Sequence, residues 1–116
     1  MSQIPSFWAE TSAEIKIENS TVKKFCFAIL SQSIYDYYYS PDPATISNIK
    51  LKRKTDKIIK EAKNWLTDLT IGEVVDGIPD VTLTWACTCL NIDPAYIARK
   101  VKELPREMFQ NTKKAA

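Results

Sequence analysis

Glycine is almost absent from this chain, and its scarcity narrows the possible folds more than any other feature does. Only Gly72 and Gly77 occur among the 116 residues. β-Sandwiches and barrels need a tight turn roughly every 8 to 12 residues, and glycine is a main source of such turns. Hydrophobic residues at 45% and charged residues at 26% are ordinary values for a globular chain of this length. The sequence therefore predicts one mainly α domain.

The first 19 residues carry scattered apolar side chains among Ser, Thr, Pro and Glu. We expect residues 1–19 to form a partly ordered N-terminal arm that docks as an arm or as a short strand. This segment has neither a basic start nor an apolar stretch, and no run in the chain reaches the roughly 18 apolar residues that span a bilayer. The expected location is cytoplasmic, with no membrane contact.

Residues 20–106 are expected to form a helical domain, and residues 107–116 a flexible tail. Apolar residues at three- and four-residue spacing predict a first helix that begins at residue 19 or 20 and ends near Tyr37. Its buried stripe is Val22, Phe25, Cys26, Ile29, Leu30 and Ile34. A second helix is predicted to begin with Thr55 or Asp56 as its N-cap. Its buried stripe is Ile58, Ile59, Ala62, Trp65, Leu66 and Leu69, with Trp65 as a core anchor.

Two intervening segments are less regular. Residues 70–80 contain Gly72, Gly77 and Pro79, which predict a loop or a short helical turn. Residues 35–39 include four tyrosines, and two prolines follow them. These rings either wedge between helices with their hydroxyl groups at the surface, or form an aromatic contact surface for a partner or for nucleic acid bases. The sequence leaves both interpretations open.

The residues that usually carry catalysis or metal binding are sparse. The chain has no histidine, which removes the commonest general base near neutral pH. Cys26, Cys87 and Cys89 lie in apolar helical patterns, and their odd number and spacing favour reduced, buried thiols over disulfides or a zinc site. Neither a phosphate-binding glycine loop nor a paired-carboxylate motif is present. We therefore expect a binding protein rather than an enzyme, with no cofactor and no metal.

Positive charge is concentrated in two segments, although the net charge is only +2. Residues 44–65 hold seven basic residues against two acidic ones, and residues 95–116 hold six against two. The remaining segments are acidic overall. If the two basic segments meet in the fold, they make a positive face of the kind that binds nucleic acid. The alternative is that these charges only solvate helix surfaces.

Residues 83–104 have the spacing of a helix-turn-helix. Small residues, among them Ala86, allow two short helices to cross closely. Asn91 tolerates the positive φ that reverses the chain between them. Asp93 can cap the second helix, and Pro94 at the next position has its φ already fixed.

This chain resembles the helix-turn-helix DNA-binding superfamily, and within it the small regulators of phages and prophages. The resemblance is carried by Trp65-Leu66 and by the run Trp85-Ala86-Cys87-Thr88-Cys89-Leu90-Asn91-Ile92-Asp93-Pro94-Ala95-Tyr96-Ile97-Ala98-Arg99. Asn91 stands where glycine is usual, and Asp93 stands where serine or threonine is usual. Both residues keep the required backbone role.

The resemblance implies that the helix from Pro94 to about Leu104 is the recognition helix, with its N-terminal half in the major groove. With Ile97 and Val101 facing inward, the outward side chains would be Ala95, Tyr96, Ala98, Arg99 and Lys102. Arg99 would contact guanine, and the two alanines would lie against thymine methyl groups. Phosphate contacts would come from Lys50, Lys52, Arg53, Lys54, Lys100, Lys102 and Arg106.

The function implied by this resemblance is that of a sequence-specific DNA-binding transcriptional regulator. Its partner would be double-stranded DNA, and it would act as a homodimer because one short helix reads few base pairs. The alternative is a small helical protein interaction module, such as a phage-encoded adaptor or inhibitor, that uses the same helical pair. Salt separates the two, because DNA binding weakens steeply as salt rises and an apolar protein contact does not.

Overall fold

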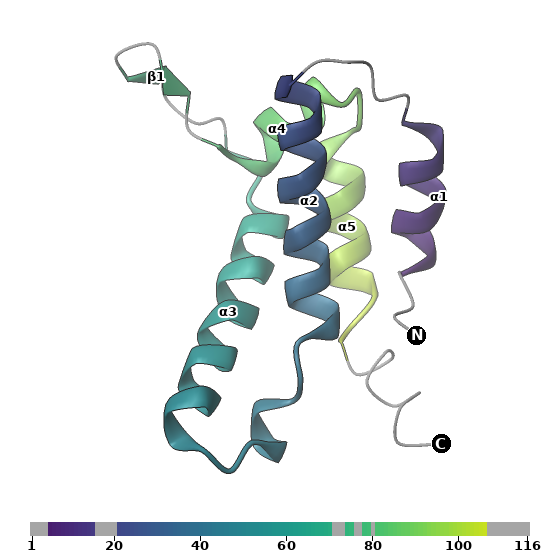
Figure 1. Ribbon diagram of the computed structural model, residues 1–116. Coiled ribbons are helices and arrows are strands. Elements are labelled where there is room, and N and C mark those ends of the chain that lie inside the picture. Colours follow the sequence, from purple (N-terminus) through teal and green to yellow (C-terminus); the bar gives the residue numbers. More distant parts are fainter. Residues whose placement is uncertain (1–4, 16–20, 71–73, 76–77, 80, 107–116) are drawn as a thin grey trace.

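The chain folds into a small helical bundle with one short hairpin (Figure 1). The computed structural model describes residues 5–15, 21–70, 74–75, 78–79 and 81–106. In chain order the elements are α1 (Ser6–Glu14), α2 (Thr21–Tyr39), the 3-10 helix η1 (Pro43–Thr45), α3 (Ile49–Thr67), β1 (Val74–Val75), β2 (Ile78–Pro79), α4 (Leu83–Cys89) and α5 (Pro94–Glu103). The mainly α fold class predicted from the sequence is confirmed. The tail expected at 107–116 lies outside the described residues, as do residues 1–4 and 16–19 of the expected arm.

Helix α3 packs against both α2 and α5 and runs antiparallel to them (Figure 1). Helix α4 lies at the end of the bundle where α5 begins, and α1 flanks the bundle on the side away from α3. Among the described residues, no helix combines the length and the apolar character needed to cross a membrane.

The buried face of α2 differs from the predicted stripe at the first two residues of that stripe. Cys26, Leu30 and Ile34 are buried as expected, and Tyr37 and Tyr38 extend the same face. The prediction is wrong for Val22 and Phe25, each of which is 49% exposed. Phe25 precedes Cys26 by one position and therefore lies about 100° around the helix from it. Val22 precedes Cys26 by four positions, so it lies on the same side of α2 but in the first turn, before the buried part of that side begins. The stripe is therefore narrower at the start of α2 than the apolar pattern indicates.

Helix α3 begins seven or eight residues earlier than expected, which corrects the prediction of an N-cap at Thr55 or Asp56. The side chain of Asn48 is the cap, and its Oδ1 accepts from the backbone N–H of Lys50 at 3.0 Å and of Leu51 at 3.2 Å. Thr55 instead lies buried within the helix. The charged residues that follow Asn48 are good helix formers, so the helix extends through them without an apolar periodicity to mark it.

The buried face of α3 consists of Thr55, Ile59, Ala62 and Leu66. Trp65, predicted to be a core anchor, is half-buried at the edge of this face, and its indole N–H donates to the Val81 carbonyl at 2.9 Å. Leu69 was expected in the same stripe, but it follows the end of the helix and is 47% exposed.

The tyrosine cluster divides between the core and the surface. The buried Tyr38 hydroxyl group donates to the Leu104 carbonyl at 2.8 Å, so it is not at the surface as the packing interpretation proposed. Burial raises the pKa of Tyr38 well above its usual value. Tyr37 is also buried, whereas Tyr35 is 52% exposed and packs against half-buried Tyr39 with ring centroids 5.3 Å apart.

Two segments form more structure than the sequence indicated. Within residues 70–80, expected to be a loop or helical turn, β1 and β2 pair antiparallel with Val75 opposite Ile78. The β-branched residues of these strands favour the extended backbone. Within the expected N-terminal arm, residues 6–14 form helix α1. Its buried Phe7 and Trp8 contact Tyr38 and Phe27, with ring centroids 6.2 and 5.6 Å apart.

Candidate nucleic-acid interface

The turn between α4 and α5 is closed by a specific set of backbone hydrogen bonds. The N–H of Ile92 donates to the Cys87 carbonyl at 2.8 Å, and the N–H of Asn91 donates to the Thr88 carbonyl at 3.2 Å. Asn91 has a φ of 58°, which confirms the positive φ predicted there. This is a Schellman arrangement, which satisfies the carbonyl groups at the end of α4 and reverses the chain.

The start of α5 is capped as its sequence predicts. Asp93 Oδ1 accepts from the Ala95 N–H at 3.0 Å, and Pro94 occupies the first helical position. Ile97 and Val101 are buried with 0% and 1% exposure, which fixes the rotation of α5 about its axis. The orientation of every outward side chain on α5 follows from these two residues.

Four residues of α5 are exposed, and three of them, Ala95, Arg99 and Lys102, follow one another at spacings of four and three residues; the fourth is Glu103. We call these three residues the α5 stripe. The expectation that Ala98 lies outward for DNA is wrong, because its exposure is only 2%. Ala98 precedes Val101 by three residues and so lies on the same buried face.

Tyr96 is half-buried beneath two cations of its own helix rather than fully outward. Arg99 Cζ and Lys100 Nζ each lie 5.7 Å from the centroid of its ring. The same two cations approach Glu103, Arg99 Nε at 3.9 Å and Lys100 Nζ at 3.8 Å. The Arg99 side chain remains 62% exposed, so these contacts are weak surface interactions that a stronger ligand can replace.

Arg106 has a structural role that the sequence did not suggest. Its guanidinium donates to the Tyr37 and Ser40 carbonyls at the C-terminal end of α2. Carbonyl groups at a helix end lack partners within the helix and carry partial negative charge. Two of the five N–H donors of Arg106 are therefore used within the protein, and the phosphate contact expected of Arg106 stays a prediction.

Of the other predicted phosphate contacts, Lys100 and Lys102 lie on α5, and the remaining four lie in the first two turns of α3. Lys50, Lys52, Arg53 and Lys54 are all exposed, and none has an ion pair with another described residue. We call these four residues the α3 basic segment. Further along α3, by contrast, Lys60 pairs with Asp56 at 3.0 Å and Lys57 with Glu61 at 3.9 Å. Uncompensated positive charge on α3 is therefore concentrated at its N-terminal end.

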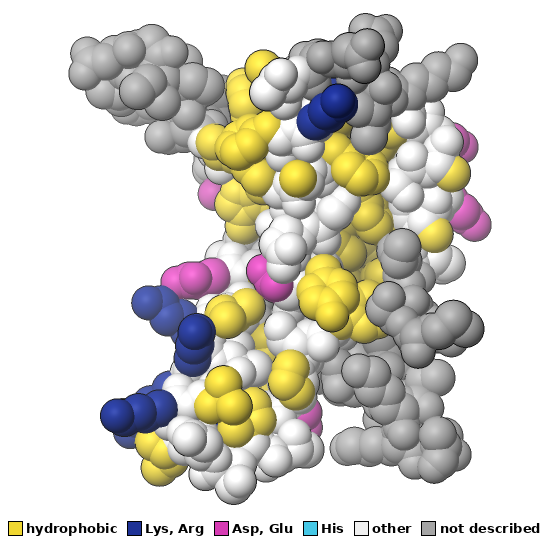
Figure 2. Space-filling view, in the orientation of Figure 1, with side chains coloured by type: hydrophobic (Ala, Val, Ile, Leu, Met, Phe, Trp, Pro, Cys, Tyr) yellow, Lys and Arg dark blue, Asp and Glu magenta, His cyan; other side chains and the backbone are white. Residues whose placement is uncertain are grey.

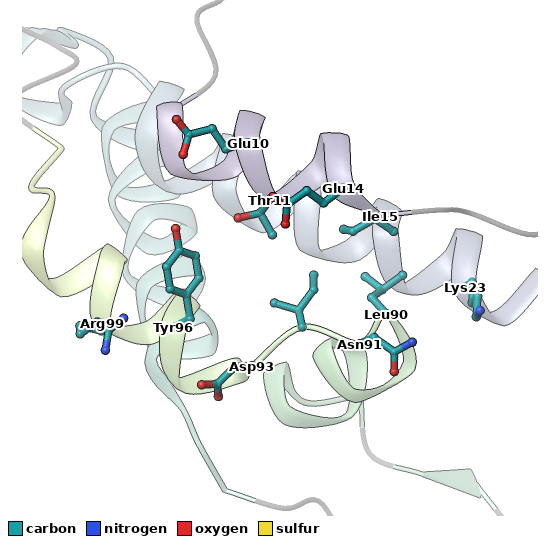
Figure 3. A pocket seen from close by; sticks show the side chains of 11 residues that line it. Glu10, Thr11, Glu14, Ile15, Lys23, Leu90, Asn91, Asp93, Tyr96 and Arg99 are labelled. Carbon is teal, nitrogen blue, oxygen red and sulfur yellow. The ribbon is translucent and has the colours of Figure 1, made fainter.

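A groove separates α1 from the start of α5 (Figure 3), with a volume of about 760 Å³. Tyr96 points across it toward α1, and Arg99 lies at its edge. Glu10 and Glu14 of α1 line the same groove. These carboxylates were not among the predicted site residues, because residues 6–14 were not expected to form a helix and so were not expected to lie beside α5.

The three cysteines lie where α2 packs against α4. Cys26 and Cys87 are buried and Cys89 is half-buried, all as free thiols. Burial raises the pKa of Cys87 to about 12, and burial together with a hydrogen bond to Cys89 raises the pKa of Cys26 to about 11. Both buried thiols therefore stay protonated and unreactive at neutral pH. No group of three or more potential metal ligands occurs within the described parts of the chain.

Comparisons with protein-family models, with curated proteins and with solved structures found no match to this chain. The function is therefore inferred from the geometry of α3 and α5.

Proposed function

We propose that this protein binds double-stranded DNA and acts as a sequence-specific transcriptional regulator. The α5 stripe would enter the major groove with Arg99 reading base edges, and the α3 basic segment would contact phosphates. The observation that supports this proposal most is the α5 stripe itself. It begins at the capped end of a short helix, is exposed along its length, and contains two cations.

The charge of the neighbouring helix adds a second reason. Helices α3 and α5 are in contact and run antiparallel, so the α3 basic segment lies toward the end of the bundle opposite the capped start of α5. A bound duplex would have to extend along the pair to contact both. Phosphate contacts supply much of the affinity for DNA, whereas base contacts supply specificity. One helix of this length reads few base pairs, so we infer that the active species is a homodimer that reads two half-sites.

The test is a fluorescence anisotropy titration with duplexes from a genomic fragment library, at two salt concentrations. Arg99→Ala should reduce the preference for the selected duplex by about 1 to 3 kcal/mol and leave binding to a scrambled duplex nearly unchanged. Lys52→Ala should weaken binding to both duplexes equally and lower the salt slope by about one. Lys24→Ala is the charge-matched control, since this exposed lysine lies on α2 and outside the proposed interface.

The alternative function is a protein interaction module, and the groove between α1 and α5 favours it. Glu10 and Glu14 line that groove together with Arg99, so DNA docked on α5 would lie close to two carboxylates. A protein partner with both charges would not be repelled in this way. Absence of salt-dependent binding to any duplex, or identical behaviour of wild type, Arg99→Ala and Lys52→Ala, would reject the DNA proposal in favour of this alternative.

A further inference from the structure

Helix α1 carries negative charge only. Its sequence contains two acidic residues, Glu10 and Glu14, and no basic one. Both carboxylates are exposed, and neither has an ion pair with another described residue. Figure 2 shows acidic side chains along the edge of α1, whereas basic side chains gather over α3. The charge of α1 is therefore uncompensated within the described parts of the protein.

The two carboxylates lie where they weaken the helix that carries them. Glu10 and Glu14 are four residues apart, so they share one face of α1 and repel each other. Glu14 is also the last residue of α1, where the helix carbonyl groups already carry partial negative charge. No basic residue in the last turn offsets this charge. The local stability of α1 therefore does not explain these carboxylates, and such departures from local rules are typical of functional positions.

The position of the carboxylates beside α5 suggests a role. Glu10 and Glu14 line one wall of the groove between the two helices, and Tyr96 and Arg99 line the other (Figure 3). An α-helix with its side chains is about 10 to 12 Å across, which is nearly the width of the major groove. A recognition helix in that groove therefore has a phosphate backbone along each flank and no room for a second helix beside it.

On the α1 flank of α5, a phosphate backbone would meet the two carboxylates. Like charges repel at distances within the Debye length, which is about 10 Å at 0.1 M salt. Docked α1 therefore opposes the entry of α5 into the major groove in two ways, through its bulk and through the charge of Glu10 and Glu14.

The attachment of α1 to the bundle is weak enough for it to leave. Its start has no side-chain cap, and its buried side chains are Phe7 and Trp8. These rings contact Tyr38 and Phe27, with centroids 6.2 and 5.6 Å apart. A nine-residue helix of this kind is not stable by itself, so detachment unfolds α1 without requiring the rest of the bundle to open.

We propose that α1 is an autoinhibitory helix, which covers one flank of α5 with negative charge and must detach before DNA binds. This inference rests on the proposed binding of DNA by α5. The carboxylates of α1 occupy the flank that the phosphates of a bound duplex would take. Because only chains with α1 detached bind, the apparent affinity for DNA is lowered by the fraction of chains that are detached.

The first test removes the charge of α1 without removing the helix. Glu10→Gln/Glu14→Gln should lower the dissociation constant for the selected duplex about fivefold in a fluorescence anisotropy titration at 0.1 M salt. The gain should shrink as salt rises, because screening weakens the repulsion. Asp36→Asn is the control, since it neutralises a carboxylate on α2, outside the proposed interface, and should change the dissociation constant less than twofold.

The second test detaches the helix. Trp8→Ala should lower the dissociation constant at least as much as the double glutamine change does. Adding Glu10→Gln/Glu14→Gln to Trp8→Ala should then give less than a further twofold gain, because the carboxylates no longer lie beside α5. A general effect of net charge would instead give the full gain in both backgrounds.

The third test follows α1 in the wild-type chain by amide hydrogen exchange. Addition of the selected duplex should accelerate exchange in α1 and slow it in α5. This measurement requires no substitution, so it does not depend on the folding of the Trp8→Ala variant.

The outcomes separate this inference from the proposed function. Salt-dependent binding by wild type, with the same dissociation constant in Glu10→Gln/Glu14→Gln, would overturn autoinhibition and leave DNA binding intact. Slower exchange in α1 on addition of duplex would also overturn it, because α1 would then be held within the complex. If neither wild type nor any variant binds a duplex, the proposed function is rejected, and this inference with it.

Discussion

Helix α1 and the α4–α5 pair are held to the rest of the molecule in different ways. The α4–α5 pair contributes Leu83, Ala86, Cys87, Ile97 and Val101 to the core, each at most 1% exposed. Side-chain caps begin both helices, and the Asn91 turn joins them. Helix α1 has no side-chain cap at its start, and its buried side chains are Phe7 and Trp8. A groove lies on each side of it.

The difference shows that α4–α5 is specified by local chemistry and α1 by two aromatic contacts. Caps and a closed turn restrict a segment to one conformation before it meets the core. Without them, a nine-residue helix is unstable by itself and depends on the surface to which it docks. We therefore expect mutations in the two regions to differ in how far their effects spread.

The largest effect is expected for Ile97→Ala. This fully buried side chain orients α5, and its truncation should lower the free energy of unfolding by about 2 to 5 kcal/mol. Urea denaturation followed by circular dichroism measures the loss, which should appear as one transition for the whole domain. Lys102→Ala, an exposed change on the same helix, should stay within about 0.5 kcal/mol of wild type. A loss of similar size in both variants would show that burial on α5 does not control stability.

Trp8→Ala is expected to have a smaller and more local effect. Truncating a core tryptophan usually costs about 3 to 5 kcal/mol, but α1 can detach from the bundle without unfolding the rest. The global free energy of unfolding should therefore fall by only about 1 to 3 kcal/mol. Amide hydrogen exchange should accelerate in α1 and stay unchanged in α4 and α5. Equal loss of protection in all three helices would contradict the comparison, because it would make α1 part of the same cooperative unit.

The smallest effect is expected at the turn. In Asn91→Ala the residue keeps a Cβ at positive φ but loses the amide side chain whose local hydrogen bonding makes that conformation tolerable. The free energy of unfolding should fall by about 1 kcal/mol. Asn91→Gly should be neutral or slightly stabilising, because glycine adopts a positive φ readily. Thermal denaturation of the two variants side by side tests this order. The local account of the turn fails if alanine is tolerated as well as glycine.

The features that could be predicted from the sequence are those determined by residues only a few positions apart along the chain. The positive φ of Asn91 and the cap at Asp93 follow from residue types within a few positions, and both are confirmed. The start of α3 could not be predicted, because its capping residue Asn48 is followed by charged residues without apolar periodicity. Helix α1 was missed for a related reason, since its stability depends on rings of α2 that are distant in sequence.

At the candidate interface, too, local residue patterns could predict some features, but not those that depend on contacts with distant parts of the chain. Periodicity from Ile97 and Val101 predicted that Arg99 faces outward, and its side chain is 62% exposed. The same reasoning failed for Ala98, because the width of a buried face depends on how closely a neighbouring helix approaches. The carbonyl contacts of Arg106 involve residues more than 60 positions away, so no local pattern could indicate them.

Those contacts of Arg106 also bear on the order of folding. The bond from Arg106 to Tyr37 joins residues 69 positions apart, whereas the bond that closes the Asn91 turn joins residues five positions apart. The entropy of closing the longer loop exceeds that of the shorter one by roughly 2 kcal/mol in the ideal-chain treatment. Most of the chain must therefore already be collapsed when the guanidinium reaches the end of α2. The contact is better suited to slowing unfolding than to guiding the chain toward its native state.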